Sequence, residues 1–154
     1  MKKIFILKGK DGSGKTTKIN TIAYWIIDTY KIPNTIGLDV TDYGKDTFGI
    51  LTIGKLKIGI NSAGDNEKEV KKLDKLIENE SENNQIDIDI IICACRTKGK
   101  GRKYIIDNYN YSNGWLQKFI NIDKFPKADI VNQNARDLRK FEELKTWLIG
   151  LEKL

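Results

Sequence analysis

The residues of this chain that are best suited to chemistry form a glycine-rich segment near residue 10. Gly9-Lys10-Asp11-Gly12-Ser13-Gly14-Lys15-Thr16 matches the pattern G-x-x-x-x-G-K-[ST], and Thr17 follows it. Glycine leaves no Cβ between backbone and ligand, so successive N–H groups can surround an anion. We expect Lys15 to reach the β- and γ-phosphates of a nucleoside triphosphate, ATP or another, and the Thr16 hydroxyl to bind Mg²⁺. The predicted phosphate-binding residues are Gly9, Asp11, Gly12, Ser13, Gly14, Lys15, Thr16 and Thr17.

The elements on either side of this segment are those that such a loop requires. An apolar run predicts a strand over residues 3–8, and a helix is expected over 14–30. One helix face carries the apolar residues Ile19, Ile22, Ala23, Ile26, Ile27 and Tyr30. The positive end of this helix would then point at the phosphates.

The rest of the chain reads as alternating strands and helices. Residues 48–53 and 56–60 predict two strands joined by Gly54-Lys55 as a hairpin, and Leu38 and Val40 hint at a short strand before them. A helix is expected over 66–80, with Val70, Leu73 and Ile77 facing inward. Residues 86–94 form the most hydrophobic run, and its continuous second half is typical of a strand buried on both faces.

The last third predicts a basic glycine-containing loop at 96–103, a short helix near 115–120, a short strand at 128–132 and a final helix at 135–151. Leu138, Phe141, Leu144, Leu148 and Leu151 would line one side of that helix. Taken together, the 154 residues predict one α/β domain, a three-layer α/β/α sandwich whose mostly parallel sheet includes a β-hairpin.

Composition excludes several kinds of chemistry. The chain has no histidine, so histidine bases, Ser-His-Asp triads and histidine metal ligands are excluded. Its two cysteines, Cys93 and Cys95, predict buried thiols and no disulfide framework. The net charge is +6, from 27 Lys and Arg against 21 Asp and Glu. That excess is spread along the chain, so nucleic-acid binding is the weakest of the readings considered.

The loop identifies the chain, by resemblance, as a member of the P-loop NTPase superfamily. Gly9 to Thr17 also resembles the loop of thymidylate kinases and related small nucleoside and nucleotide kinases. The resemblance implies a P-loop NTPase fold, Mg²⁺-dependent phosphoryl transfer and a small-molecule or nucleotide acceptor. Such kinases place arginines in a lid over the phosphates, which implies catalytic roles for Arg96 and Arg102 beside Lys15. A solvated basic loop is the equally weighted alternative for these arginines.

A second resemblance is carried by the hairpin and by Asn61-Ser62-Ala63-Gly64 after it. This order is similar to the strands of small GTPases that end in Asp-x-x-Gly, with Asn61 at the Asp position, and implies a nucleotide-dependent switch. The acidic partner of Mg²⁺ is expected after a buried strand near the loop, where Asp65 ranks first and Asp39 second. Asp65 is equally suited to cap the next helix.

Two functions therefore stay open: a kinase-like enzyme that transfers a phosphoryl group to a small acceptor or to water, and a switch or adaptor module. No apolar run approaches the roughly 20 residues of a membrane span, and a cytoplasmic location is expected.

Overall fold

The protein is built around a six-stranded sheet in which four neighbouring strands run parallel. A computed structural model describes residues 2–10, 12–30, 35–36, 46–53, 55–75, 77 and 88–148. The strands are β1 (Lys2–Gly9), β2 (Thr35–Ile36), β3 (Phe48–Ile53), β4 (Leu56–Asn61), β5 (Ile90–Cys95) and β6 (Trp115–Ile122), in the spatial order β2-β3-β4-β5-β1-β6. β4, β5, β1 and β6 are parallel, whereas β3 runs antiparallel to β4 and β2 antiparallel to β3.

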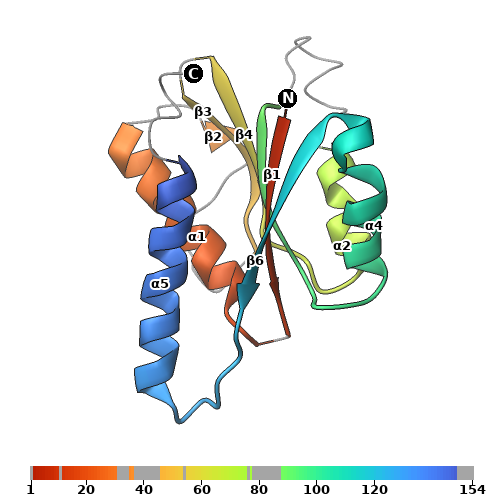
Figure 1. Ribbon diagram of the computed structural model, residues 1–154. Helices are drawn as coiled ribbons and strands as arrows, with labels where there is room; N and C mark the ends of the chain where they lie inside the picture. The colour runs from red at the N-terminus through yellow and green to blue at the C-terminus, as the bar shows by residue number, and fades with distance from the viewer. Residues whose placement is uncertain are drawn as a thin grey trace.

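Helices cover both faces of this sheet and give the fold three layers (Figure 1). The helices are α1 (Lys15–Tyr30), α2 (Glu67–Val70), α4 (Lys100–Asn108) and α5 (Ile130–Leu148), with a 3₁₀ turn at Tyr111–Asn113. α1 and α5 lie on one face, and α2 and α4 on the other. The predicted α/β class, the mostly parallel sheet and the hairpin are thereby confirmed.

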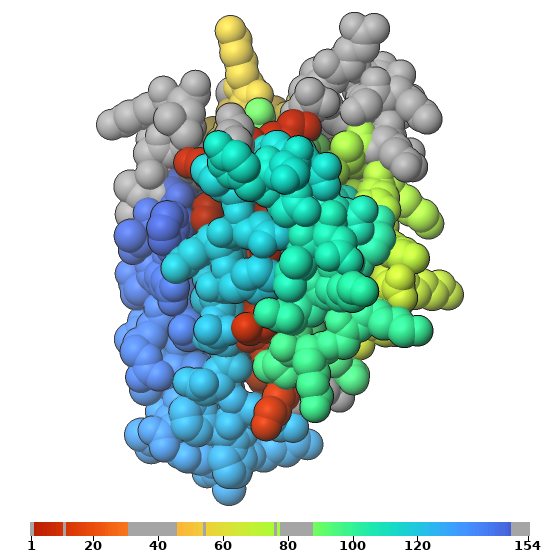
Figure 2. Space-filling model, turned by 45° about the vertical axis from the view of Figure 1, so that its right-hand side comes forward, coloured from red at the N-terminus to blue at the C-terminus, as the bar shows by residue number. Residues whose placement is uncertain are grey.

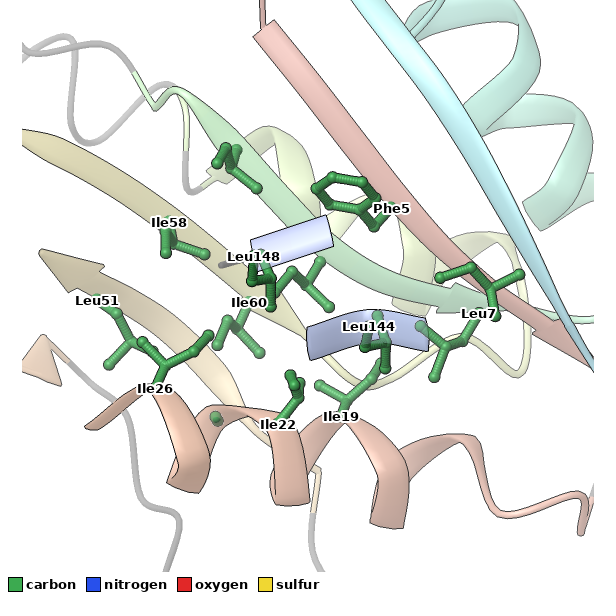
Figure 3. Close-up of a cluster of buried hydrophobic side chains, with 14 of the residues drawn as sticks. Phe5, Leu7, Ile19, Ile22, Ile26, Leu51, Ile58, Ile60, Leu144 and Leu148 are labelled. Atoms are coloured by element: carbon green, nitrogen blue, oxygen red, sulfur yellow. The ribbon is translucent and has the colours of Figure 1, made fainter. Parts of the chain in front are cut away.

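Alternation along β1 divides the core between the two faces. Phe5 and Leu7 pack on the α1 side, whereas Ile4 and Ile6 belong to the cluster on the opposite side. Figure 3 shows Ile19, Ile22 and Ile26 of α1 pointing at Leu51, Ile58 and Ile60 of the sheet, with Leu144 and Leu148 of α5 close by. The predicted inner face of the first helix is therefore correct.

Two predictions near the C-terminal third are wrong. Residues 115–122 form β6 and not a short helix, because they pair along the whole of β1, from Lys2–Trp115 to Gly9–Ile122. Residues 128–132 do not form a strand, since α5 begins at Ile130. The side chain of Asp129 accepts a hydrogen bond from the Asn132 N–H at 3.3 Å, as the residue before a helix commonly does.

Several boundaries also differ from expectation. Asn66, not Asp65, caps α2, through its Oδ1 atom and the Glu69 N–H at 2.9 Å. The basic loop ends at Gly99, and Arg102 lies on α4. On α5, Leu144 and Leu148 are buried but Leu138 is 62% exposed, so its predicted inward position is wrong. Asp11, Leu38, Asp39, Val40, Leu151 and residues 86–87 lie outside the described residues.

Candidate functional site

The glycine-rich segment forms a tight loop between β1 and α1 at the carboxyl edge of the parallel strands, the lower edge in Figure 1. Gly12 and Gly14 have φ values of 76° and 86°, in the left-handed region that favours glycine. The Ser13 N–H donates to the Lys10 carbonyl at 3.1 Å and closes the turn. The loop therefore has the compact backbone that a phosphate-binding nest requires.

Lys15 lies inside this loop. Its side chain is buried, and its ammonium donates to the carbonyls of Gly9 at 2.9 Å and Lys10 at 3.1 Å. A buried cation at the start of a 16-residue helix adds to the positive end of that helix. Positive charge and backbone N–H groups are thus concentrated at one point of the sheet edge.

A second lysine, Lys18, which the sequence analysis missed, is hydrogen-bonded to the backbone of the loop. Lys18 donates to the carbonyls of Ser13 and Gly14, both at 3.3 Å, and pairs with Asp137 of α5 at 2.6 Å. Burial lowers the pKa of Lys18, and Asp137 opposes that shift. Arg136 contacts Asp137 at 2.9 Å and donates to the Asp123 carbonyl at 2.7 Å. This network joins α5 to the loop. The one sequence signal for it is the position of Lys18, four residues after Gly14 and thus one helical turn from the loop.

The hydroxyl of Thr16 faces a carboxylate that was also missed. Thr16 Oγ1 donates to Asp46 Oδ1 at 3.1 Å, and Ser62 Oγ donates to the same oxygen at 3.2 Å. Hydroxyl and carboxylate oxygens are ligands that Mg²⁺ prefers, so this pair fits the ion. The described residues hold no group of three or more His, Cys, Asp or Glu arranged around a metal. A metal here would therefore depend on phosphate oxygens and water for its remaining ligands.

The turn after β4 reaches the loop although β5 lies between β4 and β1. Gly64 makes this possible, because a Cβ at this position would lie 2.2 Å from the Ala94 carbonyl oxygen. The turn thus crosses the end of β5 in contact with its backbone. As a result Ser62, Gly64 and Asp65 line a cavity of about 230 Å³ together with Gly12, Gly14, Lys15 and Thr16.

Two further cavities flank this central one. On the α5 side lies a cavity of about 660 Å³, lined by residues of the loop, Thr17 and Lys18, the segment 124–127, Gln133, Arg136 and Asp137. On the α4 side lies a cavity of about 420 Å³ that shares Gly64 and Asp65 with the central cavity. Figure 2 shows α4 (green) and the segment leading into α5 (light blue) on either side of the lower edge.

The predicted arginines belong to the α4-side cavity, not to the loop itself. Arg96 and Arg102 line it with Lys68, Lys98 and Lys100, giving five cations against the carboxylates of Asp65 and Glu67. The Arg102 guanidinium lies over the Phe119 ring at 5.8 Å, and its buried Nε has no hydrogen-bond partner among the described residues. The structure thus brings both arginines next to the central cavity.

The thiols at the end of β5 are core residues. Burial raises the pKa of Cys93 well above its usual value and that of Cys95 to about 11, although Arg102, Lys8 and Lys15 act on Cys95 in the opposite direction. Both cysteines are free and buried, as predicted. They are therefore unsuited to nucleophilic chemistry at neutral pH.

Comparisons with protein-family models, with curated proteins and with solved structures found no match to this chain. Among the described residues, no helix has the length and apolar character needed to cross a membrane.

Proposed function

We propose that this chain binds a nucleoside triphosphate, with ATP as the first candidate, together with Mg²⁺, and transfers its γ-phosphoryl group to a small acceptor. The main observation in support of this proposal is the row of neighbouring cavities along the sheet edge. The central cavity shares Gly12 and Gly14 with the α5-side cavity and Gly64 and Asp65 with the α4-side cavity. Such a row offers space for a nucleoside, its phosphates and an acceptor in that order.

Each part of the row has a chemical role in the proposal. The loop N–H groups, the start of α1 and Lys15 would hold the β- and γ-phosphates. Thr16 would hold Mg²⁺, which neutralises charge on the transferred group. The acceptor oxygen would form a bond to the γ-phosphorus while the bond to the bridging β-oxygen breaks, and the nucleoside diphosphate would leave with that electron pair. Arg96 and Arg102 would stabilise the negative charge on the acceptor side.

The α4-side cavity favours a kinase over a simple hydrolase. Its volume of about 420 Å³ lies within the range of small-molecule sites, and its excess of cations suits an acceptor that carries negative charge. Gly99, the N-cap of α4, has no side chain that could accept hydrogen bonds from the N–H groups of the first turn, and it lines this cavity with Lys100 and Gly101. The positive end of α4 and the two arginines therefore all place positive charge at the α4-side cavity. An enzyme of this kind would work in the cytoplasm.

A switch remains the second candidate, and one contact favours it. Thr47 and Ser62 are joined by two hydrogen bonds, Thr47 N–H to Ser62 Oγ at 2.6 Å and Ser62 N–H to the Thr47 carbonyl at 2.9 Å. The start of β3 is thereby tied to the turn that borders the central cavity. A triphosphate that moved this turn would also move β3. Different proteolysis of residues 34–66 with triphosphate and diphosphate would support this reading.

The proposal is tested by measuring diphosphate release from ATP and GTP, with and without nucleosides, nucleoside monophosphates and sugar phosphates. We expect turnover that depends on one acceptor, and a loss of at least about 100-fold in Lys15→Ala, because oriented charge at the transferred group contributes on that scale. Lys103→Ala is the matched control, since Lys103 is exposed on α4 outside the three cavities. Equal rates in the parent and Lys15→Ala, with every acceptor, would refute the proposal.

A further inference from the structure

The antiparallel direction of β3 brings its first residues to the phosphate edge of the sheet. Phe48 is paired with Asn61, and Asn61 with Cys93. Cys93 is in turn paired with Ile6 of β1, three residues before Gly9. Residues that precede β3 therefore extend beyond the end of β4, at the level where β1 enters the loop. Asp46 therefore lies at the carboxyl edge of the parallel strands, whereas a residue that precedes a parallel strand would lie at the opposite edge.

The neighbouring parallel strands offer no carboxylate at their last residues. β4 ends at Asn61, whose side chain is used internally: Nδ2 donates to the Glu69 carbonyl at 3.0 Å, and Oδ1 accepts from the Ala63 N–H at 3.1 Å. β5 ends at Cys95, which Arg96 follows. At the ends of β4 and β5, the position at which a carboxylate for Mg²⁺ is normally found is thus filled by other chemistry. Asp123 follows β6, but its carboxylate makes no hydrogen bond or ion pair with the described residues.

Asp46 is held in place by its neighbour. The Thr47 hydroxyl donates to Asn20 Oδ1 of α1, and Thr47 is joined to Ser62 by the two hydrogen bonds described above. Thr47 and Asn20 are both buried. Asp46 therefore adjoins a residue that is hydrogen-bonded to both α1 and the β4 turn, and one of its carboxylate oxygens accepts hydrogen bonds from the hydroxyls of Thr16 and Ser62.

A carboxylate beside this loop would repel a triphosphate unless a cation lay between them. We infer that Asp46, and not Asp65, is the acidic residue that holds Mg²⁺ with Thr16, directly or through a bound water. This inference rests on the proposed nucleotide binding. Both carboxylates are exposed, but Asp46 accepts a hydrogen bond from Thr16, whereas Asp65 lines the central cavity and makes no hydrogen bond or ion pair with the described residues. In this inference, a carboxylate that precedes the antiparallel strand β3 takes the role that a residue at the end of a parallel strand usually has.

The test compares Asp46→Asn with Asp65→Asn as a matched pair. Electron paramagnetic resonance would measure the affinity of Mn²⁺ for the protein saturated with β,γ-imido-ATP. We expect Asp46→Asn to weaken Mn²⁺ binding by about 10- to 100-fold, the range for lost ligand or supporting groups. Asp65→Asn should stay within about threefold of the parent. The reverse order, or equal affinities in both variants, would overturn the inference.

A second measurement separates metal binding from a merely structural role. In EDTA, β,γ-imido-ATP should bind Asp46→Asn more tightly than the parent, by about two- to fivefold, because a negative charge near the phosphates is gone. A structural defect would instead weaken binding with and without metal, and that result would overturn the inference. If the parent binds no triphosphate under either condition, the proposed function itself fails. If the parent binds the triphosphate but Asp46→Asn binds Mn²⁺ and nucleotide as the parent does, the inference fails and the proposed function stands.

Discussion

Gly64, in the turn that follows β4, lies against the backbone of β5. A Cβ at this position would meet the Ala94 carbonyl carbon at 2.5 Å and the Cys95 nitrogen at 2.9 Å, and neither backbone atom can move without shifting the strand. We expect Gly64→Ala to reduce the free energy of unfolding by about 1–3 kcal/mol, the usual cost of overpacking, and to move the turn that lines the central cavity. Urea unfolding at equilibrium measures the change. Asp65→Ala is the control, because Asp65 is the exposed next residue of the same turn and its replacement should change stability by less than about 0.5 kcal/mol.

At this scale the sequence predicts residues whose roles are local and misses those whose roles depend on the sheet. The turn-forming glycines of the loop and the burial of Cys93 follow from their own neighbourhood in the chain. The contact of Asp46 with Thr16 spans 30 positions and requires the strand order and the direction of β3. Strand order and strand direction cannot be derived from spacing alone, so the sequence predicts a carboxylate at the ends of parallel strands and not before β3.

Among the elements, α5 has a function beyond covering the sheet, because its first turns support the loop. Lys18 is 5% exposed and Asp137 is its ion-pair partner at 2.6 Å. Burial acts to raise the pKa of Asp137, but hydrogen bonds from Lys18 and Arg136 outweigh it and bring the pKa below its usual value. The interior of α5 was predicted from its apolar spacing, whereas its start was not. Residues 128–132 have strand-like composition, but the Asp129 cap and the ion pair of Asp137 with Lys18 favour a helix that begins at Ile130.

We expect Asp137→Asn to destabilise the protein by about 1 kcal/mol at pH 7, since Asp137 is half-exposed and its ion pair with Lys18 is partly screened by solvent. Because the pKa of Asp137 is lowered on folding, its contribution is complete above the pKa of the unfolded carboxyl. It is lost progressively as the pH falls through the lowered pKa of the folded carboxyl. Urea unfolding at a series of pH values should show a difference between variant and parent that is full at pH 7 and shrinks as the pH falls below the usual pKa of a carboxyl. Glu143→Gln, which breaks an ion pair with Lys140 on the same helix, should lie within about 0.5 kcal/mol of the parent. A difference that does not change as the pH falls would contradict this assignment.

At the scale of the whole molecule, the three cavities are lined by four segments that lie far apart in the sequence. Their lining combines the loop, the β4 turn, the start of α4 and the start of α5. A triphosphate bound there would contact elements on both faces of the sheet, and its binding energy would stabilise the fold as one unit. At an ATP concentration 100 times the dissociation constant, linkage adds about 2.7 kcal/mol to the free energy of unfolding, which for a chain of this length raises Tm by roughly 5–10 °C.

Calorimetry with Mg²⁺ and ATP should therefore show a single transition that moves as a whole, as expected for one domain. Lys15→Ala should show the same transition without the shift. Two transitions, of which only one responds to ATP, would mean that part of the chain folds independently of the loop, and the one-domain prediction would then be wrong.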